Sequence, residues 1–209
     1  MTISRGGMSG FVRRQWAIIL YPLGLLPAVW LVWQGQNGGL GADPVNVFER
    51  SLGLWAFRFL LICLALAPLQ RMVRFNLLRF RRLTGLLAFF YAVLHLAAYV
   101  ALDLQFDIRI FGRDLTHRPF IILGMAALAL LLPLALTSNR WSMVRLKRAW
   151  KRLHRLVYGA AVLAGIHFSL SFKTLNRTSA LYLGLLGLVL VARGPLVWSS
   201  VRRRVAGRP

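Results

Sequence analysis

The chain has 209 residues, of which 58% are hydrophobic and only 15% are charged. A soluble domain of this length could not bury so much apolar surface in one core, whereas lipid covers the outward faces of a membrane protein. Basic residues outnumber acidic ones by 27 to 5, but they occur in short runs between apolar segments. That distribution follows the positive-inside rule, so we exclude nucleic acid as a partner and predict a lipid bilayer instead.

Six apolar segments each approach the roughly 20 residues needed to cross the hydrocarbon core. They lie at about 16–33, 51–69, 83–102, 119–136, 153–171 and 179–196. The links between them are short, so consecutive helices should be antiparallel neighbours. The sequence therefore predicts an all-α fold, an integral membrane bundle of six transmembrane helices that occupies 1–209 as a single domain.

Charge sets the expected orientation of this bundle. If the N-terminus is cytoplasmic, most of the 27 basic residues fall on the inside: in the N-terminal segment, in the second and fourth links, and in the C-terminal tail. All acidic residues then fall in the outside links: Asp43, Glu49, Asp103, Asp107 and Asp114. We therefore predict that both termini are cytoplasmic. Because no predicted span carries a carboxylate, a proton-coupled transporter of the usual kind is disfavoured.

Metal-ligating side chains are few. Cys63 is the only cysteine, which excludes disulfides, iron–sulfur clusters and covalently attached haem. Of the four histidines, His117 falls in an outside link and is interpreted as an interfacial polar residue. His95, His154 and His167 fall within or at the ends of spans, where an ionisable side chain is costly and usually functional.

His95 and His167 are predicted to lie at one level of the bundle. At about 1.5 Å per residue they stand roughly 18 Å and 21 Å above the cytoplasmic starts of their spans. Two neutral imidazoles facing each other are what a six-coordinate haem iron requires, and we predict that this pair holds haem b. Two unrelated helix–helix hydrogen bonds are the alternative. Small residues would leave room for a flat macrocycle: Gly85, Ala88, Ala92, Gly159, Ala160, Ala164 and Gly165.

His154 lies at the cytoplasmic end of the fifth span, about 20 Å from His167 along the helix. The third span carries Arg81 and Arg82 at that level, so a second bis-histidine haem lacks a partner. His154 is thus a haem ligand with an unusual mate, a contact for flavin or quinone, or an interfacial cap. Arg58, in the outer half of the second span, either snorkels to the interface or neutralises a haem propionate.

Several motifs resemble those of a known family, and together they cover nearly the whole chain. They are Leu-Pro-Ala-Val-Trp-Leu-Val-Trp at 26–33, Gly-Gly-Leu-Gly-Ala-Asp-Pro-Val at 38–45, Arg-Arg-Leu-Thr-Gly-Leu at 81–86, Leu-His-Leu at 94–96, Thr-His-Arg-Pro-Phe at 116–120, Ala-Leu-Thr-Ser at 135–138, Trp-Lys-Arg-Leu-His-Arg-Leu-Val-Tyr at 150–158 and Ile-His-Phe at 166–168. The chain resembles the MsrQ (formerly YedZ) family, within the ferric-reductase-like transmembrane superfamily. Its members are haem-binding membrane subunits of the bacterial periplasmic protein-methionine-sulfoxide reductase system.

The resemblance implies an electron-transfer subunit in the bacterial inner membrane. Such a subunit takes electrons from the quinone pool or a cytoplasmic flavin reductase and passes them through FMN and one or two b-type haems. The acceptor would be a periplasmic molybdopterin-containing methionine-sulfoxide reductase, which carries the catalytic site and repairs oxidised envelope proteins. His95, His154 and His167 match the family's haem-associated histidines.

The cytoplasmic end of the bundle is predicted to carry a cationic rim that suits an FMN phosphate, a quinone site or anionic lipid headgroups. Its members are Arg81, Arg82, Arg148, Lys151 and Arg152. The outside links 34–50 and 103–118, which carry all the carboxylates, are the predicted docking surface for the partner. Two other functions stay open: a cytochrome b subunit of another quinol-linked oxidoreductase, and a cofactor-free transporter or structural membrane protein.

Overall fold

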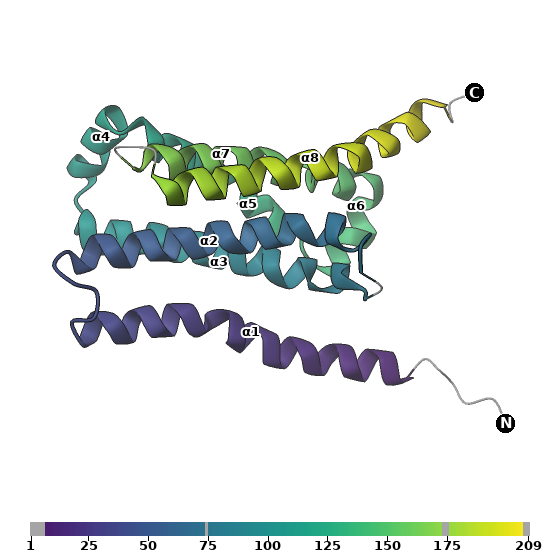
Figure 1. Ribbon diagram of the computed structural model, residues 1–209, viewed down its shortest axis with the longest axis horizontal. Helices are drawn as coiled ribbons and strands as arrows, with labels where there is room; N and C mark the ends of the chain where they lie inside the picture. The colour runs from purple at the N-terminus through teal and green to yellow at the C-terminus, as the bar shows by residue number, and fades with distance from the viewer. Residues whose placement is uncertain (1–6, 74, 173–175, 207–209) are drawn as a thin grey trace.

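The computed structural model describes the backbone of residues 7–73, 75–172 and 176–206, and the side chains of 20–73, 75–172 and 176–194. All regular structure in these residues is helical, which confirms the all-α prediction (Figure 1). The elements are α1 (Gly7–Gln36), α2 (Pro44–Leu69), η1 (Leu77–Phe80), α3 (Arg81–Ala98), η2 (Tyr99–Asp103), α4 (Ile108–His117), α5 (Pro119–Leu136), α6 (Arg140–Leu153), α7 (Leu156–Leu170) and α8 (Arg177–Ala206).

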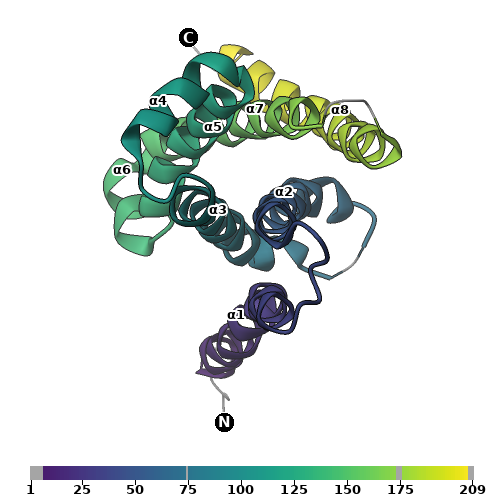
Figure 2. The same ribbon diagram turned by 90° about the vertical axis from the view of Figure 1, so that its left-hand side faces the viewer.

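The long helices run side by side and alternate in direction (Figure 1). Four of them form the centre of the bundle: α2 packs against α3, α3 against α5, α5 against α7, and α7 against α2. On the outside of this group, α8 lies against α2 and α7, and α1 lies on the opposite side against α2 and α3 (Figure 2). α1 begins and α8 ends at the same end of the bundle (Figure 1). That this end is cytoplasmic stays a prediction.

Length and hydropathy support several membrane crossings. Among the described residues, four helical segments are long and apolar enough to span a bilayer: Pro44–Leu69, Leu77–Asp103, Pro119–Leu136 and Arg177–Gly194. The bent pair formed by α6 and α7 adds a fifth if it is counted as one span. The first predicted span, 16–33, begins before residue 20, where the described side chains start, so the number six stays a prediction.

The predicted fifth span, 153–171, is not one continuous helix. α6 ends at Leu153, α7 begins at Leu156, and the two helices are bent by 48°. His154 lies in the turn, where its backbone N–H and its imidazole Nδ1 both lie within hydrogen-bond distance of the Trp150 carbonyl oxygen. A side chain that competes for a helix carbonyl favours the end of the helix. The composition of this basic segment did not predict a helix end here.

The outside links carry more helix than expected. Residues 44–50, predicted as loop, are the first turns of α2. Asp43 caps this helix by accepting a hydrogen bond from the Asn46 N–H at 3.2 Å, and Pro44 occupies the first position, where no N–H partner is needed. The second outside link contains α4, which packs its apolar side chains against Tyr99 and Ile121.

Tyr91 docks α1 onto α3. Its side chain is fully buried, and its hydroxyl accepts from the Ala28 N–H at 3.0 Å and donates to the Gly24 carbonyl at 2.9 Å. The hydroxyl is therefore inserted into one turn of α1, next to Pro27, which itself lacks an N–H for the helical ladder. Gly24 allows this close approach, because a Cβ there would lie 2.4 Å from Leu87 Cδ1.

A second proline, Pro68, frees a carbonyl of α2 to which α8 binds. Pro68 has no N–H, so the carbonyl of Leu64, four residues earlier in α2, has no helical partner. The Nη1 of Arg193 donates to this carbonyl at 3.1 Å, and its guanidinium lies 5.3 Å from the ring of Tyr158 on α7. Both contacts hold α8 against the bundle on the side opposite α1.

Candidate functional site

A cavity of about 480 Å³ lies between α2, α3, α5 and α7. This volume is within the range of small-molecule and cofactor sites. Its walls are mainly apolar and include Phe57, Leu60 and Leu131 together with the small residues Ala88 and Ala92. Apart from the histidines, the polar and charged residues that line the cavity belong to the end of the bundle where α2 begins and α7 ends: Asp43, Asn46, Glu49, Arg50, Ser51, Tyr99, Asp103, Arg118, Ser171 and Thr178.

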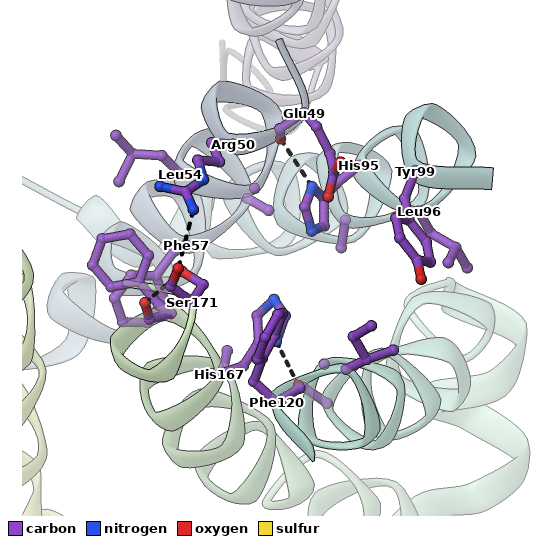
Figure 3. Close-up of a pocket in the computed structure, with 18 of the residues that line it drawn as sticks. Glu49, Arg50, Leu54, Phe57, His95, Leu96, Tyr99, Phe120, His167 and Ser171 are labelled. Atoms are coloured by element: carbon purple, nitrogen blue, oxygen red, sulfur yellow. Dashed lines mark hydrogen bonds between the residues drawn. The ribbon is translucent and has the colours of Figure 1, made fainter. Parts of the chain in front are cut away.

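His95 from α3 and His167 from α7 point toward each other across this cavity (Figure 3). Their ring centroids are 6.1 Å apart and the ring planes are inclined by 67°. The structure therefore brings together the two histidines that the sequence placed at one level.

Each imidazole is held by a backbone carbonyl of a neighbouring helix. The Nδ1 of His95 lies 2.9 Å from the Glu49 carbonyl oxygen of α2, and the Nδ1 of His167 lies 2.7 Å from the Phe120 carbonyl oxygen of α5 (Figure 3). A carbonyl oxygen only accepts, so each Nδ1 carries the proton and donates it. The Nε2 of each neutral ring then keeps its lone pair, which is the state that a metal ligand requires.

The separation of the two rings fits one metal ion between them. Two collinear metal–imidazole bonds of about 2 Å each put the ligating nitrogens about 4 Å apart. Each nitrogen lies roughly 1 Å from its ring centroid, so centroids about 6 Å apart are expected for a six-coordinate haem iron. The observed 6.1 Å agrees with this distance. Because the described residues contain no group of three or more His, Cys, Asp or Glu suited to a metal ion, the pair fits a haem better than a bare metal.

Two arginines that the sequence analysis did not single out line the mouth of the cavity. Arg50 donates from Nη2 to the Ser171 carbonyl at 3.1 Å, which joins α2 to the end of α7. Arg118 pairs with Asp114 at 3.3 Å, and Asp114 in turn accepts from the Tyr99 hydroxyl at 2.9 Å. Arg118 belongs to the Thr-His-Arg-Pro-Phe motif, which could have indicated a role at the site. Arg50 belongs to none of the motifs, so the sequence contained no such indication.

Arg58, the predicted propionate partner, is not among the residues that line the cavity. Its Nε donates to the Tyr182 hydroxyl at 2.7 Å, and its guanidinium lies 4.7 Å from the Trp55 ring centroid. The structure therefore favours a role for Arg58 in joining α2 to α8.

His154 lies outside the cavity, in the turn between α6 and α7. Its ring stacks on Trp150 with centroids 3.9 Å apart, and its Nε2 is buried without a hydrogen-bond partner among the described residues. The five rim residues also lie outside the cavity. Arg81 is half-buried at the start of α3, whereas Arg82, Arg148, Lys151 and Arg152 are exposed.

Comparison with known proteins agrees with this architecture. Residues 52–165 match the family described as "Ferric reductase like transmembrane component". The "Protein-methionine-sulfoxide reductase heme-binding subunit MsrQ" of Brucella anthropi is 46% identical over 195 residues, 93% of this chain and 86% of that protein. Proteins of the same name from Brucella ovis and Brucella canis are 45% identical over 180 residues, 86% of this chain and 82% of each relative. The chain therefore belongs to the ferric reductase-like transmembrane family and, within it, to the MsrQ heme-binding subunits of protein-methionine-sulfoxide reductase.

Proposed function

We propose that the chain is a haem b-carrying electron-transfer subunit of the bacterial inner membrane, with both termini in the cytoplasm and six crossings. The observation that carries this proposal is the pair formed by His95 and His167, whose free Nε2 edges face each other with ring centroids 6.1 Å apart. The names of the relatives add that those proteins are heme-binding subunits of a protein-methionine-sulfoxide reductase.

The residues around the cavity have distinct roles in this proposal. His95 and His167 would ligate the haem iron, and the carbonyls of Glu49 and Phe120 keep each ring in the tautomer that binds metal. Bound haem supplies one-electron redox chemistry. The apolar wall excludes water from the iron, which is one of the means by which a protein sets a haem potential.

The propionates of the haem would lie at the polar mouth of the cavity. Arg50 and Arg118 line this mouth, so we assign them the counter-charge role first considered for Arg58. Arg50 is fixed through Ser171, and Arg118 is held by Asp114. Arg118 already lies 3.3 Å from the Asp114 carboxylate and 3.9 Å from that of Asp103, so a propionate would share this guanidinium with them.

The electron donor and acceptor lie at opposite ends of the bundle in this proposal. The donor is the quinone pool or a cytoplasmic flavin reductase, and FMN or quinone would be held at the basic rim: Arg81, Arg82, Arg148, Lys151 and Arg152. The acceptor is a periplasmic molybdopterin-containing methionine-sulfoxide reductase that docks near the mouth of the cavity. His154, with its unpartnered Nε2 near the rim, would contact the flavin or quinone or ligate a second haem.

A reduced-minus-oxidised visible spectrum of the detergent-purified chain tests the proposal, with pyridine haemochrome and flavin quantified in the same sample. We expect sharp low-spin b-type bands and at least one haem per chain. Affinity purification of the chain from its native membrane should also enrich a molybdenum protein. A colourless preparation would refute the proposal, and a haem protein that enriches a different redox partner would favour another quinol-linked cytochrome b.

A further inference from the structure

We propose that Gly53 and Gly124 are positioning residues of the haem site, each forming the seat against which one ligating imidazole rests. The inference depends on the proposed function, because it concerns the rings of His95 and His167 as iron ligands. It assigns a role to two glycines on helices that contribute no ligand themselves.

The first seat lies on α2. A Cβ built on Gly53 would lie 3.2 Å from both Cε1 and Nδ1 of His95. The same Nδ1 donates to the carbonyl of Glu49, one helical turn earlier. A helix carbonyl points along the axis toward the residue four positions later. A ring that reaches the Glu49 oxygen from the side must therefore lie over residue 53.

The second seat repeats this arrangement on α5. A Cβ on Gly124 would lie 2.9 Å from Cε1 and Nδ1 of His167, and that Nδ1 donates to the carbonyl of Phe120, again four residues earlier. Gly53 and Gly124 are separated from their histidines by nearly the same length of chain. The helix pair α2–α3 and the helix pair α5–α7 thus use one device twice, on opposite sides of the cavity.

An added Cβ would be excluded at position 124 and crowded at position 53 in the present geometry. Separations below 3.0 Å are not found for real Cβ atoms, so an alanine at 124 must displace the His167 ring. A contact of 3.2 Å is tighter than most real ones, so an alanine at 53 must push His95 by a few tenths of an ångström. Displacing either ring would strain the hydrogen bond between its Nδ1 and the carbonyl oxygen. The geometry therefore predicts that alanine at position 124 displaces His167 more than alanine at position 53 displaces His95.

Two other glycines provide matched controls within the same bundle. Gly85 and Gly159 were expected to leave room for the macrocycle, but the structure places neither of them among the residues that line the cavity. A Cβ on Gly85 of α3 would lie 3.5 Å from Cys63 Sγ, and one on Gly159 of α7 would lie 3.4 Å from Leu130 Cδ1. Both distances are ordinary van der Waals contacts. Gly85→Ala and Gly159→Ala therefore make the same chemical change on the ligand-bearing helices without touching an imidazole.

The test uses the full chain in detergent, as wild type and as the variants G53A, G124A, G85A and G159A. Haem per chain, the electron paramagnetic resonance spectrum of the ferric form and carbon monoxide binding by the ferrous form are measured on the monodisperse fraction. Loss of an interaction that orients a metal ligand typically costs 10- to 100-fold in affinity. We expect G124A to retain at least tenfold less haem than wild type at a limiting haem concentration, or to hold a five-coordinate haem that binds carbon monoxide.

G53A should keep its haem but show shifted g values, because these report the relative orientation of the two imidazole planes. G85A and G159A should match the wild type in every measurement. Wild-type spectra and haem content in both G53A and G124A would overturn the inference, as would equal changes in the two control variants. If G124A yields no monodisperse protein, G53A decides the question alone: shifted g values support the seats and unshifted ones refute them.

Adding His95→Ala and His167→Ala to the same set of variants separates this inference from the proposed function. A wild-type chain without haem, or a low-spin spectrum that survives both His95→Ala and His167→Ala, refutes the proposed function and the inference with it. A wild-type haem that is lost in the histidine variants and unchanged in the glycine variants refutes the seats only.

Discussion

Replacing His167 by alanine is the most direct test of the ligand pair. The substitution removes one of the two imidazoles that face each other at 6.1 Å and leaves the other in place. It also leaves the Phe120 carbonyl without the N–H that now lies 2.7 Å away. We expect the six-coordinate low-spin haem to be lost, with any haem that remains held by His95 alone in a five-coordinate, high-spin form.

The expected loss of haem affinity follows from these contacts. Losing only a group that orients a metal ligand costs 10- to 100-fold in affinity, so losing the ligand itself should cost at least 100-fold, about 2.7 kcal/mol. Haem content at a limiting haem concentration should fall accordingly. The missing ring leaves a gap of its own size beside the side of the Phe120 carbonyl oxygen that the imidazole N–H occupied. Added imidazole fits that gap, can donate to the Phe120 oxygen and should restore the low-spin spectrum.

Visible spectroscopy of the purified variants with and without imidazole is the assay. His95→Ala should behave in the same way, because its ring has the same kind of carbonyl partner. His117→Ala is the matched control, since His117 is exposed on α4 and the partners of its Nδ1, the Arg113 carbonyl and the Thr116 hydroxyl, belong to the same helix. Retention of low-spin bands in both His95→Ala and His167→Ala would refute the ligand assignment.

Three further predictions concern the scaffold and the cofactor. Tyr91→Phe removes two hydrogen bonds, to Gly24 and Ala28, and should lower the free energy of unfolding by about 1–3 kcal/mol, measured by thermal unfolding in detergent. An unchanged midpoint would show that the inserted hydroxyl does not hold α1. Phe57→Ala removes a ring that is only 4% exposed and lines the cavity; it should cost about 3–5 kcal/mol of stability and reduce haem retention, measured on the same samples. Haem extraction should lower the unfolding midpoint, because haem at 100 times its dissociation constant contributes about 2.7 kcal/mol by mass action; equal midpoints for the two forms would contradict a site between the four central helices.

Sequence reasoning succeeded where the signal was a property of side chains along one helix. α5 was predicted at 119–136 and the structure has Pro119–Leu136, because Pro119 marks the start of a long, uninterrupted apolar run. The meeting of His95 and His167 followed from two counts of residues along two helices. Such counts work for a bundle of antiparallel helices, in which height along the axis is fixed by the rise per residue.

The parts of the site that escaped prediction belong to the backbone. The carbonyls of Glu49 and Phe120 hold the two imidazoles, yet every residue has a carbonyl and none carries a sequence signature. Gly53 and Gly124 were not singled out, because a glycine in an apolar span also reads as ordinary helix packing. Arg58 was considered for the cavity because of its depth, but depth does not determine the face of α2 on which a side chain lies.

Helix ends were the other source of error, and their causes are local. Asp43 and Pro44 are typical residues for the start of a helix, so the sequence itself indicates that 44–50 belong to α2 and not to a loop. The break at His154 had no such signal, since the segment around it contains neither glycine nor proline. It depends on the imidazole reaching the Trp150 carbonyl and stacking on the Trp150 ring, contacts that only the folded chain reveals.

The length of α7 bears on the route of electrons through the protein. This helix has 15 residues and is therefore about 22 Å long, with the haem cavity near its end and the basic rim near its beginning. None of the five rim residues lines the cavity, so a donor bound at the rim would not touch a haem between His95 and His167. If electrons come from the cytoplasm, as proposed, a second redox group in the inner half would shorten their path, and His154, whose Nε2 is buried without a hydrogen-bond partner among the described residues, is the candidate contact for it. The ratio of haem to flavin per chain identifies that group: one haem with flavin places FMN at the rim, whereas two haems make His154 a ligand. One haem with no flavin leaves a membrane quinol, reaching the bundle from the lipid side, as the donor.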